Sequence, residues 1–263
     1  MTNQSPYILA ANPGTKILVL GTADWDQAIA TNQHYMVREL LADNPLTYSE
    51  SLGLRKPELN KRDISRMIRR LLGSAGRSSV TTVSKRTRPD GLRVVSPLVI
   101  PFHTGLARVL NRRKIHRLFQ DWIKAPGPKL LWTYTPLTYG LEEFADATVY
   151  HCVDLLGEFP GVSASMIRQE EERLARTETT AIGSSQVVER HLVDAGFRDV
   201  LLWPNVADVE AVVRERPAHV KRIANRVVFA GNLSKAKVDF GMLGKIIDSG
   251  LDLHLAGPIA EGG

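Results

Sequence analysis

Short apolar runs alternate with helical stretches along most of the chain, and few folds accommodate that alternation. The run at 16–20, KILVL, is continuously apolar and ends at a glycine, as expected for a strand buried on both faces of a parallel sheet. Further strand-like runs follow at 46–50, 94–100, 129–134, 148–153, 179–182 and 200–203. Helical stretches separate them at 31–42, 61–72, 105–123, 163–177 and 186–195. The pattern predicts an α/β fold, a doubly wound parallel sheet of the Rossmann-like type with right-handed crossovers.

The pattern changes in the last quarter of the chain. Residues 206–225 are polar with little strand character, so we interpret them as a linker. The elements expected beyond it are a strand, a helix and a strand, at 226–230, 242–248 and 251–256. Two strands and one helix do not enclose a core of their own. The sequence therefore predicts a Rossmann-like domain at 1–205 and the start of a second, incomplete Rossmann-like domain at 226–263.

One block of the chain is strongly basic. Residues 55–117 hold 17 lysines and arginines but three acids, whereas the whole chain has a formal net charge of +6. Two helices in this block, 61–72 and 105–123, are amphipathic with a cationic face that suits anionic lipid headgroups. A solvated basic face on an ordinary globular helix explains the same pattern. Nucleic acid is the competing polyanion, but we find no zinc-finger, RNP-like or basic-zipper motif and expect no nucleic-acid partner.

Three further features limit the class of protein. Cys152 is the only cysteine, which excludes an internal disulfide and a zinc site made of several cysteines. No apolar run approaches the roughly 20 residues that span a bilayer. Residues 1–15 lack a basic head followed by an apolar stretch, so we expect no secretory signal. We expect a cytoplasmic protein, and the basic block leaves open a peripheral attachment to the inner face of the membrane.

Nine short segments occur in an order that resembles a known family. They are GTADWD at 21–26, TNQHYMVREL at 31–40, ESLGLRKP at 50–57, SPLVIPFH at 96–103, WTYTP at 132–136, YHCVD at 150–154, FPGV at 159–162, SSQVVERHLVDAGFRDVLLWPN at 184–205 and FAGNLSKAKVDF at 229–240. Together they are similar to bacterial GT-B glycosyltransferases of the retaining, family 4 type. The resemblance covers most of the first predicted domain and only the opening of the second.

The resemblance implies transfer of a sugar, with retention, from a nucleotide-sugar donor to a lipid-linked or polysaccharide acceptor in cell-envelope or exopolysaccharide synthesis. It implies no metal, and no cofactor besides the nucleotide-sugar co-substrate. The family usually holds the donor with glutamates that would lie beyond Gly263, so we expect residues 1–263 alone to be inactive as a transferase. The alternative is a catalytically inactive membrane-surface or protein-binding module derived from such an enzyme.

The loop after the first strand is the first candidate site, because ligands bind outside the carboxyl ends of strands in doubly wound sheets. Gly21 and Thr22 would let backbone N–H groups approach the donor phosphate. By the resemblance this loop faces the cleft between domains, where Trp25 would stack on a sugar and Asp26 would bind its hydroxyls. A plain strand-to-helix turn is the structural alternative.

Two more features belong to this loop and to the helix after it. Asn32 and Gln33, at the start of the matching segment 31–40, are further candidates for binding the acceptor sugar. Asp24 and Asp26 also fit the D-x-D spacing at which two carboxylates share a hard cation. Their place directly after the first strand, and the resemblance to a metal-independent architecture, argue against a metal.

The segment YHCVD ends the fifth strand, at the same edge of the predicted sheet. The resemblance places His151 where related enzymes carry an active-site histidine near the reacting sugar. A neutral imidazole there would hydrogen-bond the donor sugar or relay a proton from the acceptor hydroxyl. Asp154 would orient the imidazole or bind the acceptor. A buried histidine with its hydrogen bonds satisfied inside the protein is the structural alternative.

A loop of the second domain supplies the last candidates. Gly231 and Lys237 match a family pattern in which a lysine follows a glycine by six residues and stabilises the departing diphosphate. Asn232 stands where an arginine is usual, and Lys235 is the candidate to supply the missing charge. A solvated loop lysine is the alternative.

Overall fold

The computed structural model describes residues 6–27, 29–53, 86–214, 221–231, 233–234, 238–257 and 259. The chain divides into two compact units, 1–208 and 209–263. The helix expected at 61–72 lies outside the described residues, as do Asn232, Lys235 and Lys237.

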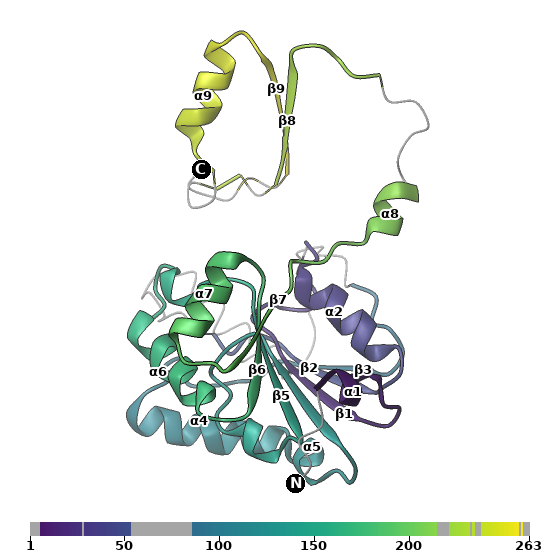
Figure 1. The fold of residues 1–263 in the computed structure, drawn as a ribbon, viewed down its shortest axis with the longest axis vertical. Coiled ribbons are helices and arrows are strands. Elements are labelled where there is room, and N and C mark those ends of the chain that lie inside the picture. The colour runs from purple at the N-terminus through teal and green to yellow at the C-terminus, as the bar shows by residue number, and fades with distance from the viewer. Residues whose placement is uncertain are drawn as a thin grey trace, which may run out of the picture. The chain divides into compact units, whose positions relative to one another are not determined.

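Unit 1 is built on a seven-stranded sheet in which every pair of neighbouring strands is parallel (Figure 1). The strands are β1 Lys16–Leu20, β2 Leu46–Ser49, β3 Leu92–Val95, β4 Lys129–Thr133, β5 Ala147–Cys152, β6 Thr179–Gly183 and β7 Asp199–Leu202. Their order is β3-β2-β1-β4-β5-β6-β7, and it reverses direction between β1 and β4. The predicted α/β class with a parallel, Rossmann-like sheet is confirmed. Ligands of such sheets bind at the reversal point, beyond the carboxyl ends of the strands.

Helices cover both faces of this sheet (Figure 1). They are α1 Pro6–Ala11, α2 Asn32–Leu41, α4 Gly105–Leu118, α5 Gln120–Lys124, α6 Ala164–Ala175 and α7 Gln186–Asp194, with the 3-10 helices η1 Leu141–Phe144 and η2 Leu156–Glu158. Ile17 and Val19 pack against α2, whereas Leu18 and Leu20 pack against α4 and α5. Tyr150 of β5 faces α6 and α7. Because alternate residues of a strand point to opposite faces, His151 lies on the α2 side of the sheet.

Two predicted elements end earlier than their patterns suggested. The strand expected at 94–100 is β3, which ends before Pro97, a residue with no N–H to donate to a neighbouring strand. The helix expected at 105–123 divides into α4 and α5 at Phe119, whose backbone leaves the helical region at φ −104° and ψ 19°. No described helix is both long and apolar enough to cross a bilayer.

The described part of unit 2 contains two parallel strands and two helices, α8 Val209–Arg214, β8 Arg226–Ala230, α9 Phe240–Asp248 and β9 Asp252–Ala256. No residue of α9 is buried, and Val228, in the middle of β8, is 63% exposed. Leu233 and Val238 are the buried apolar residues among those described in this unit. Far less apolar surface is therefore buried here than in unit 1.

The two units are expected to differ in backbone hydrogen exchange. The amides of 227–230 in β8 should exchange at least about a hundredfold faster than those of 17–20 in β1, because little apolar burial opposes local opening of β8. Exchange of the intact chain followed by mass spectrometry measures both strands in one sample. Equal protection of the two strands would show that unit 2 is as stable as unit 1.

Candidate functional site

Three aromatic rings from the ends of two strands surround His151, near the end of β5. Tyr134, directly after β4, stacks on the imidazole at a centroid distance of 4.9 Å and an angle of 28°. Trp203, directly after β7, stacks on it at 6.2 Å and 17°. Trp132 of β4 meets it at 5.8 Å and 67°. We call these four residues the His151 cluster. Because the strands are parallel, the cluster lies at the carboxyl edge of the sheet, as predicted for His151.

Polar atoms of this cluster are buried without partners. His151 is 1% exposed, and neither Nδ1 nor Nε2 has a hydrogen-bond partner among the described residues. Nε1 of Trp25 is also buried without a partner among the described residues. Nε1 of Trp132 and Oη of Tyr134 interact weakly with each other and have no well-formed hydrogen bond in the described chain. Each such group costs about 1–3 kcal/mol when it is left unpaired. Several in one place point to a site where polar groups of a ligand or of water complete the hydrogen bonding.

Burial also sets the protonation of the cluster. It lowers the pKa of His151 to about 4, so the imidazole is neutral at pH 7 and offers one donor and one acceptor. It raises the pKa of Tyr134 well above the ordinary value, so the phenol keeps its proton. Cys152, on the opposite face of β5, has its pKa raised to about 12 by burial and is not a thiolate at neutral pH.

Trp25 does not offer the open ring face that was expected of it. The side chain is 1% exposed and packs at 5.4 Å from the ring of Tyr48 and 5.0 Å from that of His34. Its backbone N–H donates to Oε1 of Glu50 at 2.9 Å. Trp25 is therefore a core residue of unit 1, and stacking of a sugar on its indole has no exposed surface to use.

The amides of the first loop are paired within the protein rather than directed at a phosphate. Gly21 N donates to Ser49 O at 2.8 Å, and Thr22 N donates to Oε1 of Gln33 at 2.9 Å. Gln33 Nε2 also donates to Oγ1 of Thr22 at 2.6 Å. A Cβ on Gly21 would lie 2.2 Å from Oη of Tyr48. The close approach of Tyr48 thus explains the glycine, and a phosphate role for Gly21 and Thr22 would require these bonds to open.

Asp26, Asn32 and Asp154 lie at the same edge in different settings. Asp26 accepts from the backbone N of Arg86 at 3.1 Å and pairs with a nearby arginine at 3.4 Å. Asn32 donates to Oδ1 of Asn205 at 2.6 Å, while its own Oδ1 is buried without a partner in the described chain. Asp154 is exposed and makes no side-chain hydrogen bond or ion pair with the described residues. Those residues contain no group of three or more side chains able to hold a metal ion.

Three residues of the edge were not singled out from the sequence. Trp132 and Tyr134 follow the period of two that places both on the His151 face of the sheet, and that spacing is the signal that could have found them. Trp203 carries no local signal, since it meets His151 only because β7 pairs beside β6 in the sheet.

The candidate glycine of unit 2 lies at the carboxyl end of β8. Gly231 N donates to Ala256 O at 2.9 Å. Gly257, with φ 144°, faces it so closely that a Cβ there would lie 1.8 Å from Gly231 O. A glycine is therefore required at position 257, where the ends of β8 and β9 meet, whereas a Cβ on Gly231 would meet only the Phe229 ring, at 3.2 Å.

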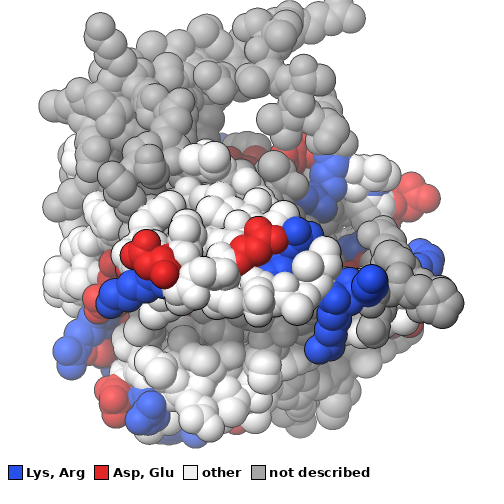
Figure 2. Space-filling model, turned by 90° about the horizontal axis from the view of Figure 1, so that it is seen from above, with Lys and Arg blue, Asp and Glu red and all other residues white. Residues whose placement is uncertain are grey.

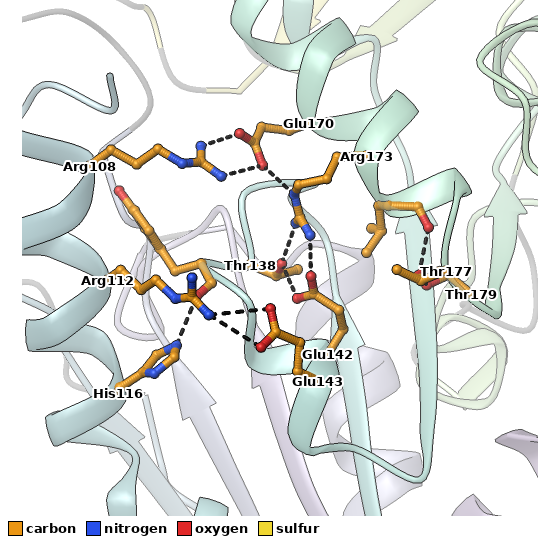
Figure 3. A network of polar contacts seen from close by, with 12 residues as sticks. Arg108, Arg112, His116, Thr138, Glu142, Glu143, Glu170, Arg173, Thr177 and Thr179 are labelled. Carbon is orange, nitrogen blue, oxygen red and sulfur yellow. Dashed lines mark hydrogen bonds and ion pairs between the residues drawn. The ribbon is translucent and has the colours of Figure 1, made fainter. Parts of the chain in front are cut away.

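Two of the basic residues of α4 form ion pairs with acidic residues of unit 1 (Figure 3). Arg108 pairs through both terminal nitrogens with the buried carboxylate of Glu170. Arg173 of α6 joins that carboxylate, at 2.9 Å, to the buried Glu142 of η1. Arg112 pairs with Glu143 at 3.2 Å. Arg108 thus ties α4 to α6 within unit 1, whereas the Arg112–Glu143 pair, with side-chain exposures of 50% and 58%, adds little stability.

The rest of α4 presents a mixed surface. Leu106, Val109 and Leu110 are 75%, 47% and 38% exposed. Its exposed cations follow further along the helix, at Arg113, Lys114 and Arg117. On the face that Figure 2 shows, which is not the face of α4, lysines and arginines of the described residues lie among aspartates and glutamates. The amphipathic character expected of 105–123 is thus present on α4, with fewer free cations than the sequence implied.

Comparison with known proteins adds no identification. No protein-family model matches the chain, and no curated protein matches it.

The packing role of Gly21 predicts the effect of a single methyl group. Gly21→Ala should lower the free energy of unfolding by about 1–3 kcal/mol, because the new Cβ overlaps the Tyr48 hydroxyl. Urea denaturation followed by circular dichroism measures the change. In a Tyr48→Phe background the same substitution should cost less, since the nearest atom is gone. A stable Gly21→Ala variant with weakened phosphate binding would instead favour the phosphate role.

Proposed function

We propose that the chain handles a sugar at the His151 cluster, as a retaining glycosyltransferase of the GT-B, family 4 type. It would transfer a sugar from a nucleotide-sugar donor to a lipid-linked or polysaccharide acceptor. The observation that carries the proposal is the coincidence of stacked aromatic rings with unpaired polar edges at the carboxyl end of the sheet. Sugars present apolar C–H faces to aromatic rings and hydroxyls to N–H, O–H and imidazole groups. His151, Trp132 and Tyr134 are each 1% exposed, so a sugar reaches them only when the side chains that cover them move aside.

The proposed role of His151 follows from its neutral state. Glycosyl transfer passes through a transition state with positive charge on the sugar ring. An uncharged imidazole adds no repulsion there and can hydrogen-bond a sugar hydroxyl. A pKa of about 4 makes it a weak base at neutral pH, so the buried form favours hydrogen bonding over proton relay. Backbone N–H groups near Gly231, together with Lys237, are the proposed partners of the donor phosphates.

Sugar binding provides a test that does not require turnover. Saturation-transfer NMR with a panel of monosaccharides and nucleotide sugars should detect binding to the wild-type chain. His151→Ala should weaken the affinity about tenfold or more, as expected for loss of a buried hydrogen bond of about 1.4 kcal/mol.

The matched control is His191→Ala, which removes a part-exposed imidazole on α7 that pairs with Glu171 at 2.8 Å. It should leave sugar affinity unchanged. No binding of any sugar by folded wild-type chain, or equal losses in both variants, would contradict the proposal.

A second candidate function, a membrane-surface module without chemistry, is favoured by one observation. Leu106 and Leu110 lie one turn apart on α4 and are exposed, with Arg113 and Arg117 continuing along the helix. Apolar side chains beside cations are the composition of helices that bind anionic lipid surfaces. The same surface would also suit a transferase whose acceptor is lipid-linked.

Vesicle flotation tests this surface. The double variant Leu106→Glu/Leu110→Glu should bind vesicles containing anionic phosphatidylglycerol about tenfold less than wild type, because it removes apolar contact and adds repulsion. Val193→Glu, at a 55% exposed position on α7, is the matched control and should float like wild type. Equal flotation of the double variant and wild type would exclude α4 as the lipid contact.

A further inference from the structure

The segment 203–208, which we call the strap, runs from the end of β7 over the His151 side of unit 1. Trp203 N makes the last main-chain bond next to β6, to Gly183 O at 2.9 Å. The Trp203 ring then stacks on His151 and lies 6.4 Å from the ring of Trp132. Val206 packs on the same core. Two side chains near the carboxyl end of β7 thus cover the site proposed above.

Polar contacts between exposed side chains also hold the strap. The exposed Asn205 accepts a hydrogen bond from Asn32, at 2.6 Å. Asp208 pairs with Arg38 at 3.6 Å, with side-chain exposures of 37% and 57%, and exposed pairs of this kind add little stability. Trp203 and Val206 supply the apolar packing of the strap on unit 1.

The atoms beneath the strap oppose its closure. Nδ1 and Nε2 of His151 are shielded from solvent and unpaired among the described residues. Lifting the strap would let water or a ligand hydrogen-bond to these atoms, whereas closing it gains aromatic stacking. Stacking therefore favours the closed strap, and hydrogen bonding of the His151 nitrogens favours its release.

We propose that the strap is a gate over His151: Trp203 closes the cluster, and release of the strap exposes the imidazole to ligands. The gate rests on the proposed function in one respect, that a ligand reaches His151. That ligand need not be a sugar. Val209, the first residue of unit 2, follows the strap directly, so the gate is also the chain connection between the units.

Chemical modification of histidine tests the gate without a ligand. Diethyl pyrocarbonate reacts with neutral, accessible imidazoles, and peptide mapping by mass spectrometry gives a rate for each histidine of the full chain at pH 7. Trp203→Ala should raise the rate at His151 about tenfold or more, because local access no longer requires strap opening. Asn205→Ala, which removes one tether, should raise it about threefold. Trp203→Phe retains an aromatic cover and should stay near the wild-type rate.

Two histidines serve as internal references. His254, in unit 2, is about half exposed and should react equally in all variants. His103 is 6% exposed on the α4 side of the sheet and reports unfolding. Unchanged His151 reactivity in Trp203→Ala, with His103 still protected, overturns the gate. If Trp203→Ala exposes His103 as well, that variant has unfolded, and Asn205→Ala becomes the test. An unchanged His151 rate in Asn205→Ala then overturns the proposal. Sugar binding plays no part in these outcomes, so the gate and the proposed function fail separately.

Discussion

Strand β1 is the constraint on which the rest of unit 1 depends. It is paired on both edges, with β2 and β4, and four of its five residues are buried. A strand with no free edge or face requires helices on both sides of the sheet, and crossovers that diverge from it in opposite directions. The carboxyl end of β1 is fixed by the same pairing. The loop that follows must turn within the space that Tyr48 of β2 leaves, which only the glycine at position 21 allows.

The β1 side and the β5 side of the carboxyl edge of the sheet differ in how far their buried polar atoms are hydrogen-bonded. On the β1 side, side chains of the protein itself satisfy the loop, with Gln33 and Glu50 accepting its N–H groups. On the β5 side, His151, Trp132 and Tyr134 are each 1% exposed, and both ring nitrogens of His151 have no partner among the described residues. A satisfied loop is rigid and holds its neighbours in register, whereas unpaired buried atoms retain unused binding capacity. Nε1 of Trp25 and Oδ1 of Asn32 are unpaired as well, but among the described residues His151 is the one at this edge with both of its polar atoms unpaired, and the proposed site is therefore centred on it.

Local sequence patterns predict the fold, whereas contacts between residues far apart in the sequence determine the surroundings of the candidate site. Continuous apolar runs predict the bounds of β1 and β4–β6 to within about two residues, because a strand that is buried on both faces needs an apolar side chain at nearly every position. Trp25 follows a strand and looks like a loop residue, yet Tyr48 and His34 bury it from elements that come later in the chain. The charge of α4 was overestimated for a similar reason, since Glu170 lies 62 residues from the arginine that it neutralises. Such pairings depend on the order of the strands, which no local pattern encodes.

The exposure of His151 to solvent determines both the access of ligands to the imidazole and its pKa. Desolvation is the cause that lowers its pKa, and the Trp203 ring that stacks on the imidazole contributes to that burial together with Trp132 and Tyr134. Opening of the strap would rehydrate the ring and raise its pKa toward the ordinary value near 6.5. At neutral pH the covered imidazole suits hydrogen bonding, and the uncovered one suits proton transfer. A ligand that replaces water beneath the strap would restore the low-pKa state, so the timing of any proton transfer would be set by when the strap closes.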